Sequence, residues 1–303
     1  MPAAANEKRV ALTFDDIPRS PGAFMTPDER TAALLAALRS SGVEQAAFFL
    51  NPCHLAKANG VGGEERIAAY VEAGHVIANH SCTHPKLSNS TAKEYLADID
   101  KASSWFAGKA GYRSWFRFPY LDEGGRDKAK RDAVRAGLAK RGLSNGYVTA
   151  DGSDWYLEQL TKDAKKAGDD INLKALRRLY VGSQMSGLEY HDELARLTLG
   201  RSPAHVMLLH ETDLAALFIE DFVAEAKRRG WTIITADEAF ADPINTAMPD
   251  VPYSSGTLIG SMAWERDIDP PLSPVWMGTN AMNAVFERRV AKSVPKEDGK
   301  PAD

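Results

Sequence analysis

The segment Val10-Ala11-Leu12-Thr13-Phe14-Asp15-Asp16 is a short apolar run that ends in two carboxylates. Similar runs alternate with longer segments of helical period as far as about Phe240, which is typical of βα units around a parallel sheet. The runs that we interpret as strands are Val10 to Phe14, Ala46 to Leu50, Val76 to Ala78, Trp115 to Phe118, Gly146 to Ala150, Val206 to Leu209 and Thr232 to Thr235. Seven such runs predict an α/β barrel.

The first helix carries the clearest local signals. Thr26 is the expected N-cap, Pro27 takes the first helical position, Glu29 completes a capping box and Gly42 ends the helix. Further helices are expected over Glu64 to Ala73, Thr91 to Ala107, Asp127 to Arg141 and Leu214 to Arg229. Residues 156–203 form a charged stretch without a convincing strand, so we expect a helical insertion in one βα connection that shapes the substrate cleft.

Proline interrupts every periodic segment after Asp242, and only Ala281 to Ala291 looks helical. We therefore expect one catalytic domain over residues 8–242 and a Pro-rich C-terminal extension over residues 243–303 that is not an independent domain. The extension would pack over the barrel or join two copies of the chain in a homo-oligomer. Beyond Val294, where charged residues and glycine dominate, we expect partial disorder.

Composition excludes several classes of protein. A chain of 303 residues that is 44% hydrophobic can bury one large core, and a net charge of −4 spread along the chain disfavours nucleic acid as a partner. No apolar run reaches the roughly eighteen residues of a membrane-spanning helix.

The Ala-rich start, Pro2 to Glu7, fits the remainder of a cleaved leader, so we expect a periplasmic or secreted protein, with the cytoplasm as the alternative.

Two pairs of residues at strand ends suggest a metal site. Asp15 and Asp16 follow the first run, and His80 and His84 follow the run that ends at Ala78. Adjacent carboxylates repel unless a cation or a shared proton neutralises them, and histidines four apart match a two-ligand metal clamp. Taken singly, the first pair is also compatible with a turn and the second with loop histidines. Together, Asp16, His80 and His84 predict a catalytic metal site with an open position, which activates water.

Other strand ends also carry polar residues. Arg117 follows Trp115 and Phe116, Asp151 and Asp154 follow Ala150, and His210 ends the run that starts at Val206. Each has a simpler explanation, such as a surface cation, an N-cap or a half-buried histidine. Because parallel barrels place the carboxyl ends of their strands at one face, we expect these residues to converge with the metal site.

These segments resemble, in order, the five motifs of the polysaccharide deacetylase family, also called the NodB-homology domain or carbohydrate esterase family 4. The matching segments are Thr13-Phe14-Asp15-Asp16, His80-Ser81-Cys82-Thr83-His84, Arg117-Phe118-Pro119-Tyr120, Asp151-Gly152-Ser153-Asp154-Trp155 and Leu208-Leu209-His210. The resemblance implies a distorted (β/α)7 barrel, here with a helical insertion before the last motif. It also implies a metal-dependent hydrolase that removes acetyl groups from a carbohydrate.

The same resemblance implies a role for each site residue. Asp16, His80 and His84 would hold one divalent metal ion, zinc first, with cobalt or nickel as alternatives. By the same resemblance, Asp15 would be the catalytic base, oriented by Arg117, and His210 would be the acid, with its pKa tuned by Asp154. The Tyr120 backbone N–H would stabilise the oxyanion. Trp155 and Leu208 would wall the pocket for the acetyl methyl group.

Some features depart from the family pattern and leave alternatives open. Ile17-Pro18 replaces the commoner Gly-Pro, and the stretch from Trp155 to Leu208 is longer than in compact members. The substrate is therefore either an N-acetylated amino sugar or an O-acetylated, xylan-like polysaccharide. A metal-free hydrolase of cyclic amides and a non-catalytic glycan-binding barrel are further alternatives, and the intact set of ligands argues against both. Cys82 is interpreted as a packing residue or a partner of Cys53, not as a ligand.

Overall fold

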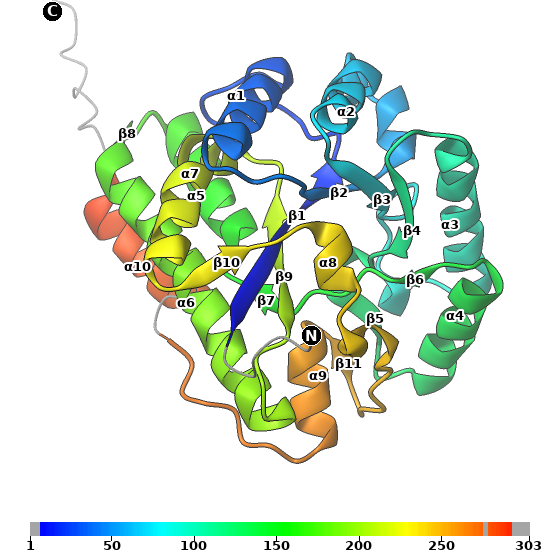
Figure 1. Ribbon diagram of the computed structural model, residues 1–303. Helices are drawn as coiled ribbons and strands as arrows, with labels where there is room; N and C mark the ends of the chain where they lie inside the picture. The colour runs from blue at the N-terminus through cyan, green and yellow to red at the C-terminus, as the bar shows by residue number, and fades with distance from the viewer. Residues whose placement is uncertain (1–6, 275–277, 293–303) are drawn as a thin grey trace, which may run out of the picture.

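A curled sheet of parallel strands forms the centre of the computed structural model, which describes residues 7–274 and 278–292. The strand order is β6-β4-β3-β2-β1-β9-β7, and β10 also pairs with β1. The strands are β1 (Lys8–Ile17), β2 (Ala47–Leu50), β3 (Val76–Asn79), β4 (Tyr112–Phe116), β6 (Ser144–Asn145), β7 (Ala150–Asp151), β9 (Ala204–His210) and β10 (Trp231–Ile233). Helices surround this sheet (Figure 1), so the predicted α/β barrel-type fold is confirmed.

Helices follow the strands as the sequence predicts, and a short helix at residues 236–240 is present in addition. They are α1 (Pro27–Ser40), α2 (Gly63–Glu72), α3 (Ala92–Phe106), α4 (Lys128–Lys140), α5 (Asp154–Ala167), α6 (Leu173–Leu199), α7 (Asp213–Arg228) and α8 (Ala236–Phe240). The capping box at the start of α1 is present, because the Thr26 side chain accepts from the Glu29 N–H and the Glu29 side chain accepts from the Thr26 N–H. Gly42 follows the end of α1 in the left-handed conformation, as glycine allows.

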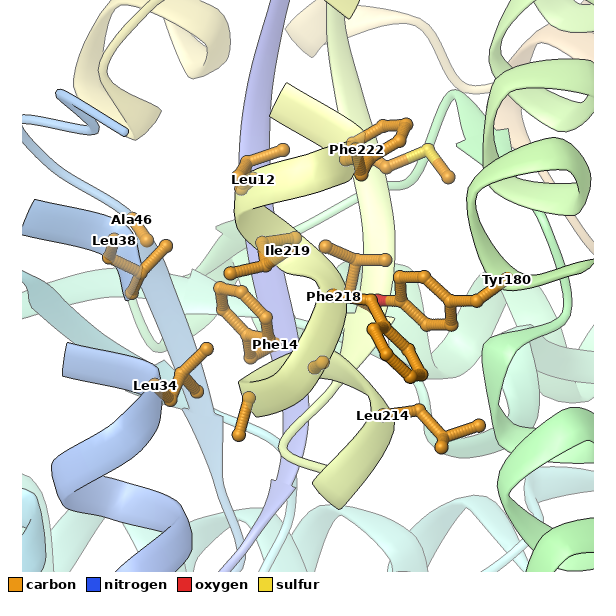
Figure 2. Packing of buried hydrophobic residues seen from close by; sticks show 14 of the residues in the cluster. Leu12, Phe14, Leu34, Leu38, Ala46, Tyr180, Leu214, Phe218, Ile219 and Phe222 are labelled. Atoms are coloured by element: carbon orange, nitrogen blue, oxygen red, sulfur yellow. The ribbon is translucent and has the colours of Figure 1, made fainter. Parts of the chain in front are cut away.

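Strand β1 is the most connected strand of the sheet. Its first residues pair with β10, its middle pairs with β9 and its last part pairs with β2. Leu12 and Phe14 pack outward beneath α7 and α1 (Figure 2), while Ala11 belongs to the buried cluster of the barrel interior. A strand that is buried on both faces explains the continuous apolar run at the start of the sequence.

The sheet is irregular where one continuous strand was predicted, over Gly146 to Ala150. Here β6 pairs with β4 and β7 pairs with β9, so this single segment of chain spans the two ends of the sheet. The predicted strand is wrong at residues 146–149, whose backbone instead donates from Gly146 N to Phe116 O over 2.7 Å and from Thr149 N to Val206 O over 3.0 Å. The expected strand at Trp115 to Phe118 is shifted as well, since Phe118 lies beyond β4. These irregularities distort the barrel.

The insertion is helical, as predicted, and consists mainly of α5 and α6. Between them lies the two-residue strand β8 (Asp170–Ile171), which pairs with β12 (Ala291–Lys292) of the extension. The extension thus packs against the insertion. The boundary between the catalytic domain and the extension, expected after residue 242, stays a prediction.

The expectation of one helix in the extension is wrong. Besides α10 (Thr279–Arg289), the structure has α9 (Leu258–Glu265), which shares a buried cluster with Ala11 and Val206 of the barrel interior. A short two-turn helix between Pro-rich flanks has too little periodicity to be recognised, and burial in the barrel stabilises it. Short strand β11 (Ser254–Ser255) also pairs with β5 (Asp122–Gly125).

Two predictions concern parts of the chain that the structure does not describe. Of the predicted leader remnant at residues 2–7, residues 2–6 lie outside the described residues, and so does the tail beyond Val294. Within residues 7–274 and 278–292, none of the helices combines the length and apolar character needed to cross a bilayer.

Candidate functional site

The three predicted metal ligands meet at the carboxyl end of the sheet. Asp16 is the penultimate residue of β1, His80 directly follows β3, and His84 lies one short turn later. Oδ1 of Asp16 lies 2.9 Å from Nε2 of His84 and 3.4 Å from Nε2 of His80, and the two ring nitrogens are 3.2 Å apart. Three potential ligand atoms therefore face one point.

This arrangement fits a cation. Oδ1 of Asp16 is buried, and within the described part of the chain it has no hydrogen-bond partner. A buried carboxylate oxygen is costly unless a positive charge or a donor compensates it. One oxygen and two imidazole nitrogens form the donor set of a catalytic zinc-type site, in which a further position stays open.

The turn that carries the histidines is held from helix α3. Asp98 accepts hydrogen bonds from the backbone N–H groups of Cys82 and Thr83, at 2.7 and 3.1 Å, and from the Thr83 hydroxyl at 2.8 Å. His84 adopts a positive φ of 63°, and its N–H donates to Oγ of Ser81. Asp98 therefore supports a conformation that a residue with a side chain rarely adopts.

The His80 ring is oriented from its other nitrogen. Nδ1 of His80 lies 2.9 Å from the backbone carbonyl oxygen of Arg117. When this nitrogen carries the proton and donates it, the lone pair of Nε2 points toward Asp16, as in histidines that bind metals in proteins.

Asp15 lies on one side of the three ligand atoms and is fixed by a buried arginine. Arg117 Nη1 donates to Oδ1 of Asp15 over 2.6 Å and to Oγ1 of Thr13 over 2.8 Å, and Arg117 Nε donates to the Gly146 carbonyl over 2.7 Å. The other carboxylate oxygen, Oδ2, lies 3.6 Å from Nε2 of His80. Asp15 is thus held by one oxygen and presents the second to the site.

Arg117 also accounts for the irregular backbone at residues 146–149. Its guanidinium bonds to the carbonyls of Gly146 and Tyr147 and stacks 3.7 Å from the centre of the Phe49 ring. Burial lowers the pKa of Arg117, and the charge of Asp15 opposes this shift. Between β6 and β7, the backbone carbonyls thus accept hydrogen bonds from the Arg117 side chain instead of from a neighbouring strand.

His210 lies on the neighbouring strand. The register of β1 and β9 places Asp15 directly opposite His210. Nδ1 of His210 lies 2.7 Å from Oδ1 of Asp154, whose other oxygen accepts from the His210 backbone N–H. Burial lowers the pKa of His210, but the charge and hydrogen bond of Asp154 outweigh it and raise the pKa to about 9. His210 is therefore cationic at neutral pH.

Asp154 does not cap helix α5, which was the simpler explanation for it. The N-cap is Ser153, whose side chain makes no capping hydrogen bond, and Asp154 is the first helical residue. Its fully buried carboxylate is directed to His210 instead.

These residues surround a pocket of about 500 Å³. Its lining consists of Asp15, Asp16, Arg19, His80, His84, Tyr120, Leu121, Asp151, Trp155, Gln159, Leu208, His210 and Gly256. Of the predicted site residues, Arg117 and Asp154 lie behind this lining, where they contact Asp15 and His210. The structure thus brings all the predicted site residues together.

The predicted pocket walls differ in exposure. Trp155 is half exposed on α5, whereas Leu208 is buried on β9. The Tyr120 ring lies 4.5 Å from the His84 ring, measured between centroids, and Tyr120 has a positive φ of 60°. The role of its backbone N–H stays a prediction.

Several lining residues were not predicted. Arg19 lies three residues after Asp16 and donates from Nη1 to Oδ2 of Asp16 over 2.6 Å. Gln159 comes from the insertion and Gly256 from the extension. Burial and the nearby Asp154 raise the pKa of Asp151, a motif residue without an assigned role, to about 6. The position of Arg19, three residues after Asp16, could have indicated an ion pair at the site. No local feature of the sequence indicates that Gly256 lines the pocket.

Comparison with known proteins is consistent with the site. The family model described as polysaccharide deacetylase matches residues 3–140. The predicted resemblance to the polysaccharide deacetylase family is confirmed. The matched stretch holds Asp15, Asp16, the two histidines and Arg117, whereas Asp154 and His210 lie beyond it. No curated protein matches the sequence.

Solved structures with the same fold include members of this family. A family 4 carbohydrate esterase from Streptomyces lividans, in complex with acetate, is 22% identical, with 80% of this chain and 98% of that chain covered and a TM-score of 0.51. The peptidoglycan deacetylase PdaC from Bacillus subtilis is 21% identical, with coverage of 78% and 92% and a TM-score of 0.50. A protein of Bacillus anthracis described as a CE4 family pseudoenzyme is 18% identical, with coverage of 78% and 66% and a TM-score of 0.51. These similarities show the fold alone.

Cys53 and Cys82 form a disulfide, which answers the question that the sequence left open. Cys82 lies between the two histidines, and its sulfur is bonded to Cys53 rather than directed to the ligand set. The backbone N–H of Cys53 also donates to the Cys82 carbonyl over 3.2 Å.

Proposed function

We propose that the protein is a divalent-metal-dependent deacetylase that hydrolyses acetyl groups on a carbohydrate, with the N-acetyl groups of an amino sugar as the first candidate substrate. One observation carries the proposal. Three ligand atoms, a fixed carboxylate and a cationic histidine converge on one pocket, in which Asp15 and His210 lie opposite each other in the strand register.

Asp16, His80 and His84 would hold the ion, with zinc as the first candidate and cobalt or nickel as alternatives. A bound divalent cation supplies polarisation of the acetyl carbonyl and acidifies the attacking water. The turn held by Asp98 and the hydrogen bond from His80 to the Arg117 carbonyl keep the ligand atoms aligned for it.

Asp15 would take the proton of the attacking water through Oδ2, the oxygen that faces His80. The Arg117 guanidinium donates to Oδ1 of Asp15 and so fixes the orientation of this carboxylate. A general base must be deprotonated and within reach of the water, and this carboxylate meets the geometric requirement.

His210 would donate a proton to the leaving nitrogen or oxygen. Its pKa of about 9 keeps it protonated at neutral pH, as a general acid requires. The Tyr120 backbone N–H would bind the developing oxyanion, and Trp155 and Leu208 would enclose the acetyl methyl group.

Acetate release tests the proposal directly. The purified protein is stripped with a chelator, reloaded with zinc, cobalt or no metal, and incubated with chitin oligosaccharides, peptidoglycan fragments and acetylated xylan. We expect acetate release that depends on metal and follows binding of about one ion per chain. Release from xylan alone would make the protein an O-acetyl esterase, and release that survives chelation would contradict the metal site.

The matched variant is His80→Ala. Reloading should restore the wild-type protein but not the variant, which loses metal and activity together because one of three ligands is gone. Glycan binding without turnover by the metal-loaded wild-type protein would favour a non-catalytic barrel.

A further inference from the structure

A smaller side pocket opens beside the metal ligands. It has a volume of about 230 Å³ and is lined by Asp16, Pro18, Arg19, Ser20, His54, His84 and Lys162. Asp16, Arg19 and His84 line both this pocket and the larger one. A glycan whose acetyl group reaches the metal ligands can therefore place a neighbouring substituent in the side pocket.

Arg19 forms the wall between the two pockets. Among the described residues, the Arg19 guanidinium makes one hydrogen bond, which Nη1 donates to Oδ2 of Asp16. The guanidinium has five N–H donors in a planar fork, so most of them remain available to a ligand.

A buried side chain of the core holds the backbone of Arg19 in place. The fully buried Arg30 donates from Nη2 to the Arg19 carbonyl over 3.2 Å and from Nη1 to the Ser20 carbonyl over 3.0 Å. Arg30 is itself paired with Glu211 and Asp213. The backbone beneath the side pocket is thus held in place by a buried ionic network.

Lys162, on α5, also lines the side pocket. It is half-buried, and the structure shows no hydrogen bond or ion pair for its ammonium group among the residues it describes. Glu158, one turn earlier, is buried and accepts from the Leu214 backbone N–H. Asp163, the next residue along α5, accepts from Gln159.

The lining of the side pocket therefore carries an excess of positive charge. Arg19 and Lys162 are cations, and Asp16 is the one carboxylate of the lining. A divalent ion on Asp16 would increase the excess. An anionic oxygen group is the natural ligand for a pocket lining that carries a guanidinium fork and an ammonium group.

We propose, building on the proposed deacetylase function, that this side pocket binds an anionic group of the acetylated glycan, a carboxylate or a phosphate. Arg19 binds it through the N–H groups that Asp16 leaves available, and Lys162 supplies a second charge. The preferred substrate is then an acidic acetylated sugar rather than a neutral polymer.

Matched substrates and variants test this inference. Acetate release is measured for N-acetylated oligosaccharides of equal length that are neutral, carry a carboxylate ether or carry a phosphate ester. We expect a higher kcat/KM for at least one of the two acidic substrates than for the neutral one. The acidic substrate with the higher kcat/KM shows whether the side pocket binds a carboxylate or a phosphate. Lys162→Met should reduce the acidic-to-neutral ratio of kcat/KM about tenfold, the effect of one charge-assisted contact.

The control is Lys166→Met, which removes the same charge from an exposed position on the same helix. It should leave the ratio at the wild-type value, and rising ionic strength should reduce the wild-type preference. Equal kcat/KM for acidic and neutral substrates, or equal ratios in the two variants, would overturn the inference while the deacetylase function stands.

A failure of the proposed function gives a different result. If no substrate releases acetate, calorimetric binding of the acidic and neutral oligosaccharides to the metal-loaded protein still tests the side pocket. Tighter binding of the acidic form that is lost in Lys162→Met would support it. Equal affinities would exclude it.

Discussion

The reaction centre and the rim of the pocket are built in opposite ways. At the centre, Asp15, Arg117 and Asp154 are buried, and Oδ1 of Asp15 and both carboxylate oxygens of Asp154 make short hydrogen bonds. At the rim, Trp155 is 46% and Tyr120 is 57% exposed. The sheet thus fixes the groups that would perform the proposed chemistry, while more exposed side chains would contact the substrate.

The two regions meet at the start of α5 and in the loop after β4 but otherwise come from different parts of the chain. The centre comes from the ends of strands β1, β3 and β9, from Arg117 after β4 and from Asp154, the first residue of α5. The rim is assembled from the loop after β1, Tyr120, the exposed face of α5 and Gly256 beside β11. One implication is that substitutions at the centre reduce turnover for every substrate, whereas those at the rim change the ranking of substrates.

Asp15→Asn should have the largest effect among the centre variants that retain metal. An amide cannot accept the proton of the attacking water, so kcat should fall by about 10²–10⁴-fold on all substrates. Metal content, measured by elemental analysis, should match the wild-type protein because Asp15 is not among the three ligands. Full activity with metal bound would show that another group is the base.

Asp98→Ala tests whether the histidine turn needs its support from α3. The variant removes three hydrogen bonds to Cys82 and Thr83, so metal affinity should fall about 10–100-fold. Excess metal should then restore most of the activity. The control Asp100→Ala, on the same helix but paired with Arg141, should keep wild-type affinity. Equal affinities in the two variants would make the support dispensable.

Asp154→Asn should mainly change the pH dependence. Burial lowers the pKa of His210 and Asp154 raises it to about 9, so removing that charge moves the pKa down. The acid form is then lost at lower pH, and the alkaline limb of the kcat/KM profile should shift to lower pH. The profile is measured on the metal-loaded protein. An unchanged alkaline limb would remove His210 from the role of acid.

Much of the reaction centre was predictable because its signals are local. An apolar run that ends in Asp15 and Asp16 predicts both a buried strand and a polar strand end, and the same holds for His210 after Val206 to Leu209. Parallel strands bring such ends to one face, so residues far apart in sequence could be grouped before any distance was known.

The rim was less predictable because its contacts join distant segments. Arg30, which is paired with Glu211 after β9, holds the carbonyl of Arg19. Gly256 lies beside β11, which pairs with β5. Neither contact leaves a periodic pattern in the sequence.

The sequence by itself determined β1, the capped helix α1, the order of the motifs and which residues are the candidate metal ligands. These depend on local periodicity, caps and the side-chain chemistry at strand ends. The tertiary structure alone decided how the barrel is bridged at residues 146–149, where α9 packs, and which charges surround the side pocket. Such features depend on burial and long-range contacts, whose energies no short segment of sequence contains.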